Sequence, residues 1–284
     1  MSKADWIFIE MCRNIIDHGT STEGEEVRHK WADGTPAYTL KQFGVVNRYD
    51  LREEFPALTL RRTEIKSCVE EILWIWQKKS NNVKDLKNRM WDCWADERGS
   101  IGLAYGYQMQ VKHQHREGLL DQVDKLLYDL RHYPYSRRML TNLYVHQDLH
   151  KMNMYPCAYS MTFNVTKERG SNQRTLNAIL NQRSQDVLVG NNRNVCQYAV
   201  LLHMFAQVSN MQVGELVHVI ADAHIYNRHI PLVEALIDRN PLPAPTFWIN
   251  PAVKNFYEFT VDDIRLDDYL VHPQIEDIPM VNSI

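Results

Sequence analysis

The sequence predicts an α/β fold in a single domain spanning residues 1–284. Segments in which apolar residues recur at helical spacing are followed by segments in which they alternate at spacing two, the period of a β-strand. The 284 residues are 44% hydrophobic, which is enough to bury a substantial core. No internal repeat, low-complexity segment or linker divides the chain. These features exclude a disordered chain.

The first third of the chain predicts two helices with a strand between them. Apolar residues at helical spacing continue to His18, where Gly19 provides a stop. The polar segment 20–34 shows no regular pattern, and residues 38–49 have the composition of a strand. The second helix, residues 65–76, is strongly apolar.

Glu71 lies on the crowded face of that second helix, whereas its neighbour Glu70 is expected to face solvent. A carboxylate on an apolar face is costly to bury unless it binds a partner or a water molecule. A half-buried glutamate of this kind is suited to proton transfer. Glu71 is therefore a candidate functional residue.

The middle of the chain predicts a reactive thiol. A short helix, residues 123–130, ends before Pro134. Two alternating segments, residues 159–165 and 176–180, then predict paired strands. Cys157 directly precedes the first strand and Arg183 directly follows the second, so the thiol and the guanidinium are expected to lie close together. Such a cation favours the thiolate.

The last third of the chain predicts one long buried helix and one long strand. The helix covers residues 195–206, and Asn194 at its start is a favoured N-cap residue. In the strand, Asp222, His224 and Tyr226 follow at spacing two and share one face. The proline-containing segment 241–251 predicts turns, and a last strand is expected within residues 259–266.

Charge and cysteine content narrow the functional classes. A net charge of −3 gives no general attraction to nucleic acid, so phosphate recognition must come from local arginines. Five cysteines without a C-x-x-C spacing predict neither a disulfide framework nor a zinc site. The sequence shows no secretory signal and no apolar run near the roughly 20 residues that span a bilayer. We expect a cytoplasmic protein that needs no metal.

Ordered motifs along nearly the whole chain resemble the thymidylate synthase family. The matching segments are Glu71-Ile-Leu-Trp74, Arg89-Met-Trp-Asp-Cys-Trp-Ala-Asp-Glu-Arg-Gly99, Tyr105-Gly106, Asp121-Gln122, Ser136-Arg-Arg138, Pro156-Cys157, Gln182-Arg-Ser-Gln-Asp186, Gly190 with Asn194, and Asp222-Ala-His-Ile-Tyr226. The resemblance implies one mixed, twisted sheet, flanked by helices, that packs against its twin in a homodimer. It also implies reductive methylation of dUMP to dTMP with 5,10-methylenetetrahydrofolate as co-substrate.

The resemblance assigns catalytic roles to residues already noted. Cys157 would add to carbon 6 of the pyrimidine, with Arg183 as its activating cation and phosphate partner. Glu71 would organise the waters that exchange protons with the ring, and Tyr105 would lie near the thiol and the leaving proton. Asn194 would read the uracil edge, because an amide both donates and accepts.

The resemblance also implies the nucleotide contacts. Arg28 would bind phosphate, although from sequence alone it equally fits a surface arginine. The pair Arg137 and Arg138 would cross the dimer interface to the neighbouring subunit's phosphate; in an unknown protein such a pair is usually solvated. The further nucleotide contacts implied are Gln182, Arg183, Ser184, Asp186, Asn194, His224 and Tyr226.

The folate contacts implied by the resemblance lie in three parts of the chain. Trp91 and Trp94, three residues apart, would border the pteridine ring, whereas spacing alone favours core packing for such a pair. Asp186 would orient the folate and also take part in catalysis. The full set implied is Trp91, Trp94, Asp186, Gly190, Ser283 and Ile284.

Three departures from the family pattern leave the reaction open. Ala158 stands where histidine is common, Leu143-Tyr144 where Trp-Asn is common, and Arg193 where phenylalanine is common. A cation beside Asn194 can change ring or folate contacts. One alternative is a deoxyuridylate hydroxymethylase, and another is a silent homologue that binds nucleotide or RNA. A deoxycytidylate-directed enzyme is disfavoured, because it would carry aspartate in place of Asn194.

Overall fold

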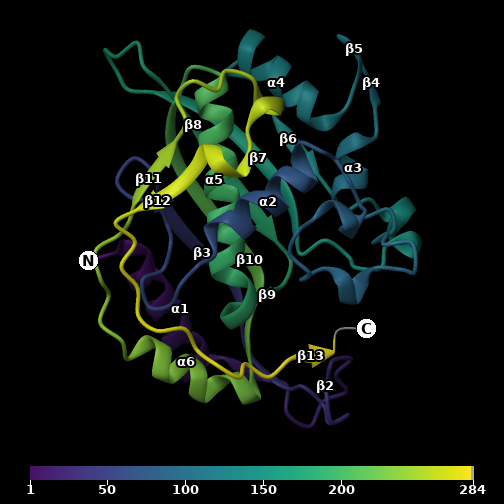
Figure 1. Cartoon of the computed structure of the whole chain (residues 1–284), viewed down its shortest axis with the longest axis vertical. Helices are drawn as coiled ribbons and strands as arrows, with labels where there is room; N and C mark the ends of the chain where they lie inside the picture. The colour runs from purple at the N-terminus through teal and green to yellow at the C-terminus, as the bar shows by residue number, and fades with distance from the viewer. Residues whose placement is uncertain (283–284) are drawn as a thin grey trace.

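The protein is built around a mixed seven-stranded sheet, seen in the computed structural model, which describes residues 1–282 (Figure 1). The strand order is β1-β3-β10-β8-β7-β6, and β9 pairs with β10 off this path. Neighbours are antiparallel except for β8 and β9, which both run parallel to β10. The strands are β1 Thr20–Ser21, β3 Thr39–Asp50, β6 Leu140–Asn142, β7 Ala158–Lys167, β8 Arg174–Gln182, β9 Gln185–Asp186 and β10 Gln212–Tyr226.

Three small two-stranded sheets accompany the large one. They pair β2 Lys30–Trp31 with β13 Val281–Asn282, β4 His113–His115 with β5 Gly118–Leu120, and β11 Thr246–Ile249 with β12 Ile264–Asp267. The pairing of β2 with β13 joins the last described residues to the loop segment between β1 and β3, whereas the N-terminus lies on the other side of the molecule (Figure 1).

Six α-helices are described, and two of them carry the core. The helices are α1 Lys3–His18, α2 Ile65–Trp76, α3 Gly106–Gln110, α4 Gln122–His132, α5 Asn192–Val208 and α6 Ile230–Ile237. Short turns of helix are η1 Val83–Asp85, η2 Asp92–Trp94, η3 His146–Lys151, η4 Val187–Asn191 (a π-turn), η5 Asn227–His229, η6 Phe256–Glu258 and η7 Val261–Asp263. Helix α5 is surrounded by apolar contacts, and α2 and α5 lie together over one face of the sheet (Figure 1).

The other face of the sheet presents apolar side chains without cover from residues 1–282. Val46 is 52% exposed and Ile179 is 40% exposed. Val46 pairs with Val219, and Ile179 pairs with Val217, so these side chains share that face. Exposed apolar patches on a sheet mark interaction surfaces in soluble proteins.

Most of the predicted elements are confirmed, with bounds shifted by a few residues. The helices predicted at residues 65–76 and up to His18, the strand at 38–49, and the paired strands after Cys157 are all present. The predicted long strand that contains Asp222, His224 and Tyr226 is β10. No helix among residues 1–282 combines the length and apolar character of a membrane span.

Four expectations are corrected. Segment 20–34 was expected to lack regular structure, but it contains β1 and β2. Segment 241–251 is not all turn, since it contains β11. The last predicted strand is confined to Ile264–Asp267. Asn194 is not the N-cap of α5, because the π-turn Val187–Asn191 leads directly into the helix and makes Asn194 its third residue.

Candidate active site

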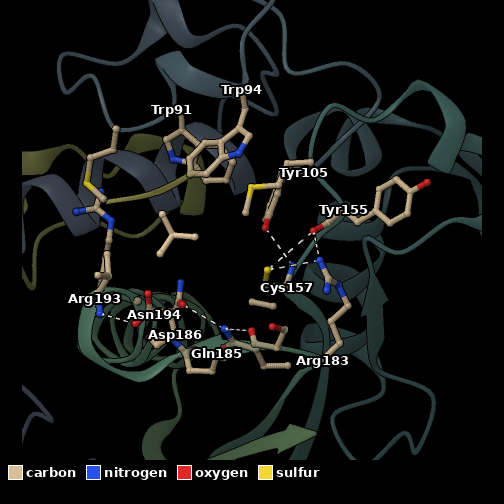
Figure 2. Close-up of a pocket in the computed structure, with 18 of the residues that line it drawn as sticks. Trp91, Trp94, Tyr105, Tyr155, Cys157, Arg183, Gln185, Asp186, Arg193 and Asn194 are labelled. Carbon is tan, nitrogen blue, oxygen red and sulfur yellow. Dashed lines mark hydrogen bonds between the residues drawn. The ribbon is translucent and has the colours of Figure 1, made fainter. Parts of the chain in front are cut away.

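A cavity of about 580 Å³ opens where β7, β8, β10 and the start of α5 meet α2 and the tryptophan turn η2 (Figure 2). Most of the predicted site residues share this cavity as lining. They are Arg28, Glu71, Trp91, Trp94, Tyr105, Cys157, Gln182, Arg183, Ser184, Asp186, Gly190, Asn194, His224 and Tyr226.

Two predicted residues lie apart from this cavity, and two more fall outside the described chain. Arg137 and Arg138 are exposed and are not among the residues lining it. Ser283 and Ile284 lie outside the residues that the structure describes.

Cys157 and Arg183 are brought together by the pairing of β7 with β8. Ala158 pairs with Gln182, and the Arg183 amide donates to the Cys157 carbonyl at 2.9 Å. The guanidinium donates to the carbonyls of Tyr155 at 2.8 Å and Pro156 at 3.0 Å, and it lies 3.6 Å from the Cys157 Sγ. Burial raises the pKa of Cys157, and the Arg183 charge acts against that rise. Backbone carbonyls thus hold a cation at the thiol.

Tyr105 contacts the same cysteine from the side of the cavity that carries Trp91 and Trp94 (Figure 2). Its hydroxyl accepts a hydrogen bond from the Cys157 amide at 3.2 Å. Its backbone has φ +47°, a left-handed conformation that is rare for tyrosine. The next residue, Gly106, has no room for a side chain, because a Cβ there would lie 2.0 Å from the Ser80 carbonyl oxygen. Burial raises the pKa of Tyr105 well above its usual value, so the hydroxyl stays protonated.

Trp91 and Trp94 form an aromatic wall with Tyr105. The Trp91 ring lies 5.4 Å from that of Trp94 and 4.9 Å from that of Tyr105, both edge to face. Trp91 also contacts Trp74 of the core. Trp91 is therefore partly a core residue, while both tryptophans still border the cavity.

Asn194 belongs to a row of side-chain amides on the floor of the cavity. The Gln182 Nε2 donates to the Asn194 Oδ1 at 3.2 Å and to the Ser184 carbonyl at 3.1 Å. The Asn194 Nδ2 in turn donates to the Gln197 Oε1 at 3.1 Å. The side chain of Asn194 thus binds other side chains and does not cap its helix.

Arg193 forms an ion pair with Glu71 that links α5 to α2. Its Nε and Nη2 lie 3.0 and 2.6 Å from the Glu71 Oε2, and Nη2 also donates to the carbonyl and hydroxyl of Ser67. The two side chains are only 14% and 6% exposed. Burial opposes the Arg193 charge, but Glu71 outweighs that effect and raises the pKa of Arg193. The expectation that Glu71 requires a partner is confirmed.

Asp186 and Gly190 shape the π-turn that leads into α5. The Asp186 Oδ1 accepts from the Val189 amide at 3.0 Å, which satisfies an open donor at the start of the turn. A Cβ at Gly190 would lie 2.6 Å from the Gln185 Nε2 and 3.6 Å from the Asn194 Oδ1. A larger residue at position 190 would therefore have to displace the end of the Gln185 side chain.

His224 and Tyr226 line the end of the cavity nearest the strands β3 and β10. The His224 Nδ1 lies 2.8 Å from the Asp222 Oδ1, and Lys41 contacts the other carboxylate oxygen at 3.1 Å. Burial raises the pKa of Asp222, but its bonds with His224 and Lys41 outweigh burial and lower it. The carboxylate therefore orients the His224 ring and holds a proton on Nδ1.

Several lining residues were not predicted from the sequence. They are His29, Tyr155, Gln185, Gln197, Met280 and Val281. Gln197 had a usable signal, because it follows Asn194 at the same-face spacing of three on a predicted helix. Val281 had none, since it reaches the cavity by the pairing of β13 with β2. Among residues 1–282, no cluster of three or more His, Cys, Asp or Glu side chains is arranged to hold a metal ion.

Comparison with known proteins agrees with this geometry. The family model for thymidylate synthase matches residues 6–281. A thymidylate synthase of Bacillus licheniformis is 43% identical over 274 residues, 95% of this chain and 96% of the relative, and one of Bacillus phage phi3T is 41% identical over the same shares. The solved structure of thermostable thymidylate synthase A from Bacillus subtilis superposes with a TM-score of 0.91, 38% identity and coverage of 98% and 99%. The chain belongs to the thymidylate synthase family.

Proposed function

We propose that the chain converts dUMP to dTMP by reductive methylation, with 5,10-methylenetetrahydrofolate as the source of the carbon and the hydride. Membership of the family places the chain among the methyltransferases of dTMP synthesis. The observation that carries the proposal is the Cys157 thiol, 3.6 Å from Arg183 in a cavity that also presents the amide of Asn194. Residues 1–284 are proposed to form a single catalytic domain.

Cys157 supplies the nucleophile in this mechanism. Carbon 5 of uracil is a poor nucleophile until a group adds to carbon 6. The Cys157 sulfur forms that bond, and the electron pair of the ring double bond moves toward carbon 5 and the carbonyl at carbon 4. The positive charge of Arg183 lowers the free energy needed to form the thiolate. When the carbon 5 proton has left and the new substituent is in place, the sulfur–carbon bond breaks and the thiolate returns.

The remaining lining residues divide between nucleotide and folate. Gln182, Ser184, Arg183 and Arg28 form the polar end that suits a phosphate, with Asn194 at the base and His224 and Tyr226 at the sugar hydroxyl. Trp91 and Trp94 offer a flat wall against which a pteridine ring stacks, beside Asp186 and Gly190. Glu71 borders the same space and serves proton transfer.

The uncovered sheet face supports a homodimer. Val46 and Ile179 form an apolar patch that a second copy would bury, and Arg137 and Arg138 are exposed and free to reach a neighbour's cavity. Mixing inactive Cys157→Ala chains with inactive Arg138→Ala chains should then restore about a quarter of wild-type activity, because one site in each mixed dimer is intact. Proven subunit exchange without recovery would contradict the role of Arg138 across the interface.

All five cysteines are free, including Cys157, which requires a reducing compartment and supports a cytoplasmic location.

Product analysis tests the reaction itself. Wild-type protein is incubated with dUMP and 5,10-methylenetetrahydrofolate, and the nucleotide is identified by mass. The expected product is dTMP with equimolar dihydrofolate. A product heavier by one oxygen atom would indicate the hydroxymethylase, and bound but unchanged dUMP would indicate a silent homologue. Cys157→Ala protein is the control for uncatalysed chemistry.

A further inference from the structure

His218 on β10 is fully buried behind the cavity and is not among the residues lining it. Its Nε2 lies 2.8 Å from the Oε1 of Gln182, which does line the cavity. Burial lowers the pKa of His218 to about 3, so the ring is neutral and carries one proton. The position of that proton is linked to the orientation of the neighbouring Gln182 amide, because a donor must face an acceptor.

A backbone carbonyl fixes the polarity of this contact. The Ser184 carbonyl can only accept, so the Gln182 atom 3.1 Å from it must be the amide nitrogen. The Oε1 of Gln182 therefore faces His218, and the histidine must hold its proton on Nε2 to donate. The His218 Nδ1 is left as an acceptor without a partner among residues 1–282.

The orientation of the Gln182 amide also fixes the orientation of the Asn194 amide, which lies between Gln182 and Gln197. The Gln182 Nε2 donates to the Asn194 Oδ1, so the Asn194 nitrogen must face the other way, toward the Gln197 Oε1. The contact with Gln182 uses one lone pair of the Asn194 oxygen, and the contact with Gln197 uses one hydrogen of the Asn194 nitrogen. One lone pair and one N–H of that amide remain for a ligand in the cavity.

A fixed orientation of this amide is what separates uracil from cytosine. Uracil presents a donor at N3 and an acceptor at O4, whereas cytosine presents an acceptor at N3 and a donor at N4. An asparagine that turned its amide over would satisfy cytosine as well as it satisfies uracil. Asn194 therefore discriminates only while its oxygen and nitrogen cannot exchange places.

We propose that His218 is a positioning residue for base recognition: by donating to Gln182 it holds the Asn194 amide in the order that fits uracil and rejects cytosine. The inference rests on the proposed function, because it takes dUMP as the bound nucleotide. Without the histidine donor, the Gln182 Oε1 is a buried acceptor with no partner, since Gln182 is only 2% exposed. The glutamine then turns to satisfy that oxygen and releases Asn194.

The test compares His218→Phe with His218→Gln. Phenylalanine fills the space without a donor, and glutamine places an amide nitrogen where the imidazole Nε2 stood. His203→Phe is the matched control, because burial also lowers the pKa of His203 to about 3, but His203 packs against Phe247 and does not line the cavity. The affinities of the intact protein for dUMP and dCMP are measured by calorimetry, together with kcat/KM for dUMP.

We expect His218→Phe to lower the ratio of dUMP to dCMP affinity about tenfold, and His218→Gln to return it toward the wild-type value. An unchanged ratio in His218→Phe, or an equal loss in His203→Phe, would overturn the inference. Wild-type turnover of dUMP is recorded in parallel. Its absence would contradict the proposed function, whereas normal turnover with an unchanged ratio would contradict the positioning role alone.

Discussion

The cavity contains two guanidinium groups in opposite circumstances. Within residues 1–282, the hydrogen-bond partners of the Arg183 side chain are two backbone carbonyls and the sulfur of Cys157, so its charge is not neutralised by a carboxylate. Arg193 is paired with Glu71 and is further bound by Ser67. The comparison shows two uses of arginine in one cavity. Arg183, beside Cys157, keeps its charge available to stabilise an anion, whereas Arg193, beside Asn194, joins α5 to α2 through its ion pair with Glu71.

Cys157→Ser gives the largest expected effect, because it removes the thiolate that the Arg183 charge stabilises. A hydroxyl at neutral pH is a far weaker nucleophile than a thiolate, so kcat should fall by about three orders of magnitude or more. Binding of dUMP should persist, since the amide end is untouched. Calorimetry and steady-state kinetics measure the two quantities. Turnover near the wild-type value would remove Cys157 from the mechanism.

Asn194→Asp tests the amide end with the next largest effect. An ionised carboxylate accepts from the amino group of cytosine but cannot donate to the O4 of uracil. The ratio of kcat/KM for dUMP to that for dCMP should fall at least about 100-fold, because a site built for a polar edge rejects the wrong partner strongly. The measurement is turnover of each nucleotide. An unchanged ratio would mean that the base is read elsewhere.

Arg183→Gln and Arg193→Gln sharpen the comparison directly. The thiolate is the reactive form, and burial already raises the pKa of Cys157 against the lowering effect of Arg183. Loss of Arg183 should raise that pKa further, so the pH at which iodoacetamide alkylates the thiol at half its maximal rate moves upward. At neutral pH the alkylation rate should fall about tenfold. Arg193→Gln is the matched control, and an equal shift in both variants would erase the distinction.

Arg193→Phe should have the smallest effect on base choice. It restores the residue common in the family but leaves Glu71 without its partner, which lowers the melting temperature by a few degrees. The ratio of dUMP to dCMP turnover should stay at its wild-type value, while folate affinity or the ratio of methyl to hydroxymethyl product changes. Product masses and folate titration check both. A large shift in base preference would place Arg193 at the pyrimidine.

Local patterns predicted the elements of the fold that carry strong periodicity. The alternation around Phe163 and Ala178 predicted β7 and β8, and hence the approach of Cys157 to Arg183. Strand β11 was missed because it is four residues long and lies beside prolines. The start of α5 was misplaced because a π-turn has no simple sequence signature, and Asn194 has the composition of a cap.

Local sequence patterns could not predict contacts between residues that are far apart in the chain. Arg193 was recognised as unusual, and Glu71 as in need of a partner, yet 122 positions separate them. No spacing rule joins two helices across such a distance. The same limit applies to His218 and Gln182, whose contact depends on the parallel register of β8 and β10.

The central position of β10 also governs when this protein can fold during its synthesis. Strand β3 pairs with β10 from Asp50 opposite Glu215 to Thr39 opposite Tyr226. Until residue 226 has left the ribosome, β3 has only the short β1 beside it, and side chains such as Tyr49, which are buried in the finished fold, remain exposed. Contacts of such long sequence separation form slowly. The cavity is therefore a late product of folding, and an unfinished chain is a natural client for a chaperone.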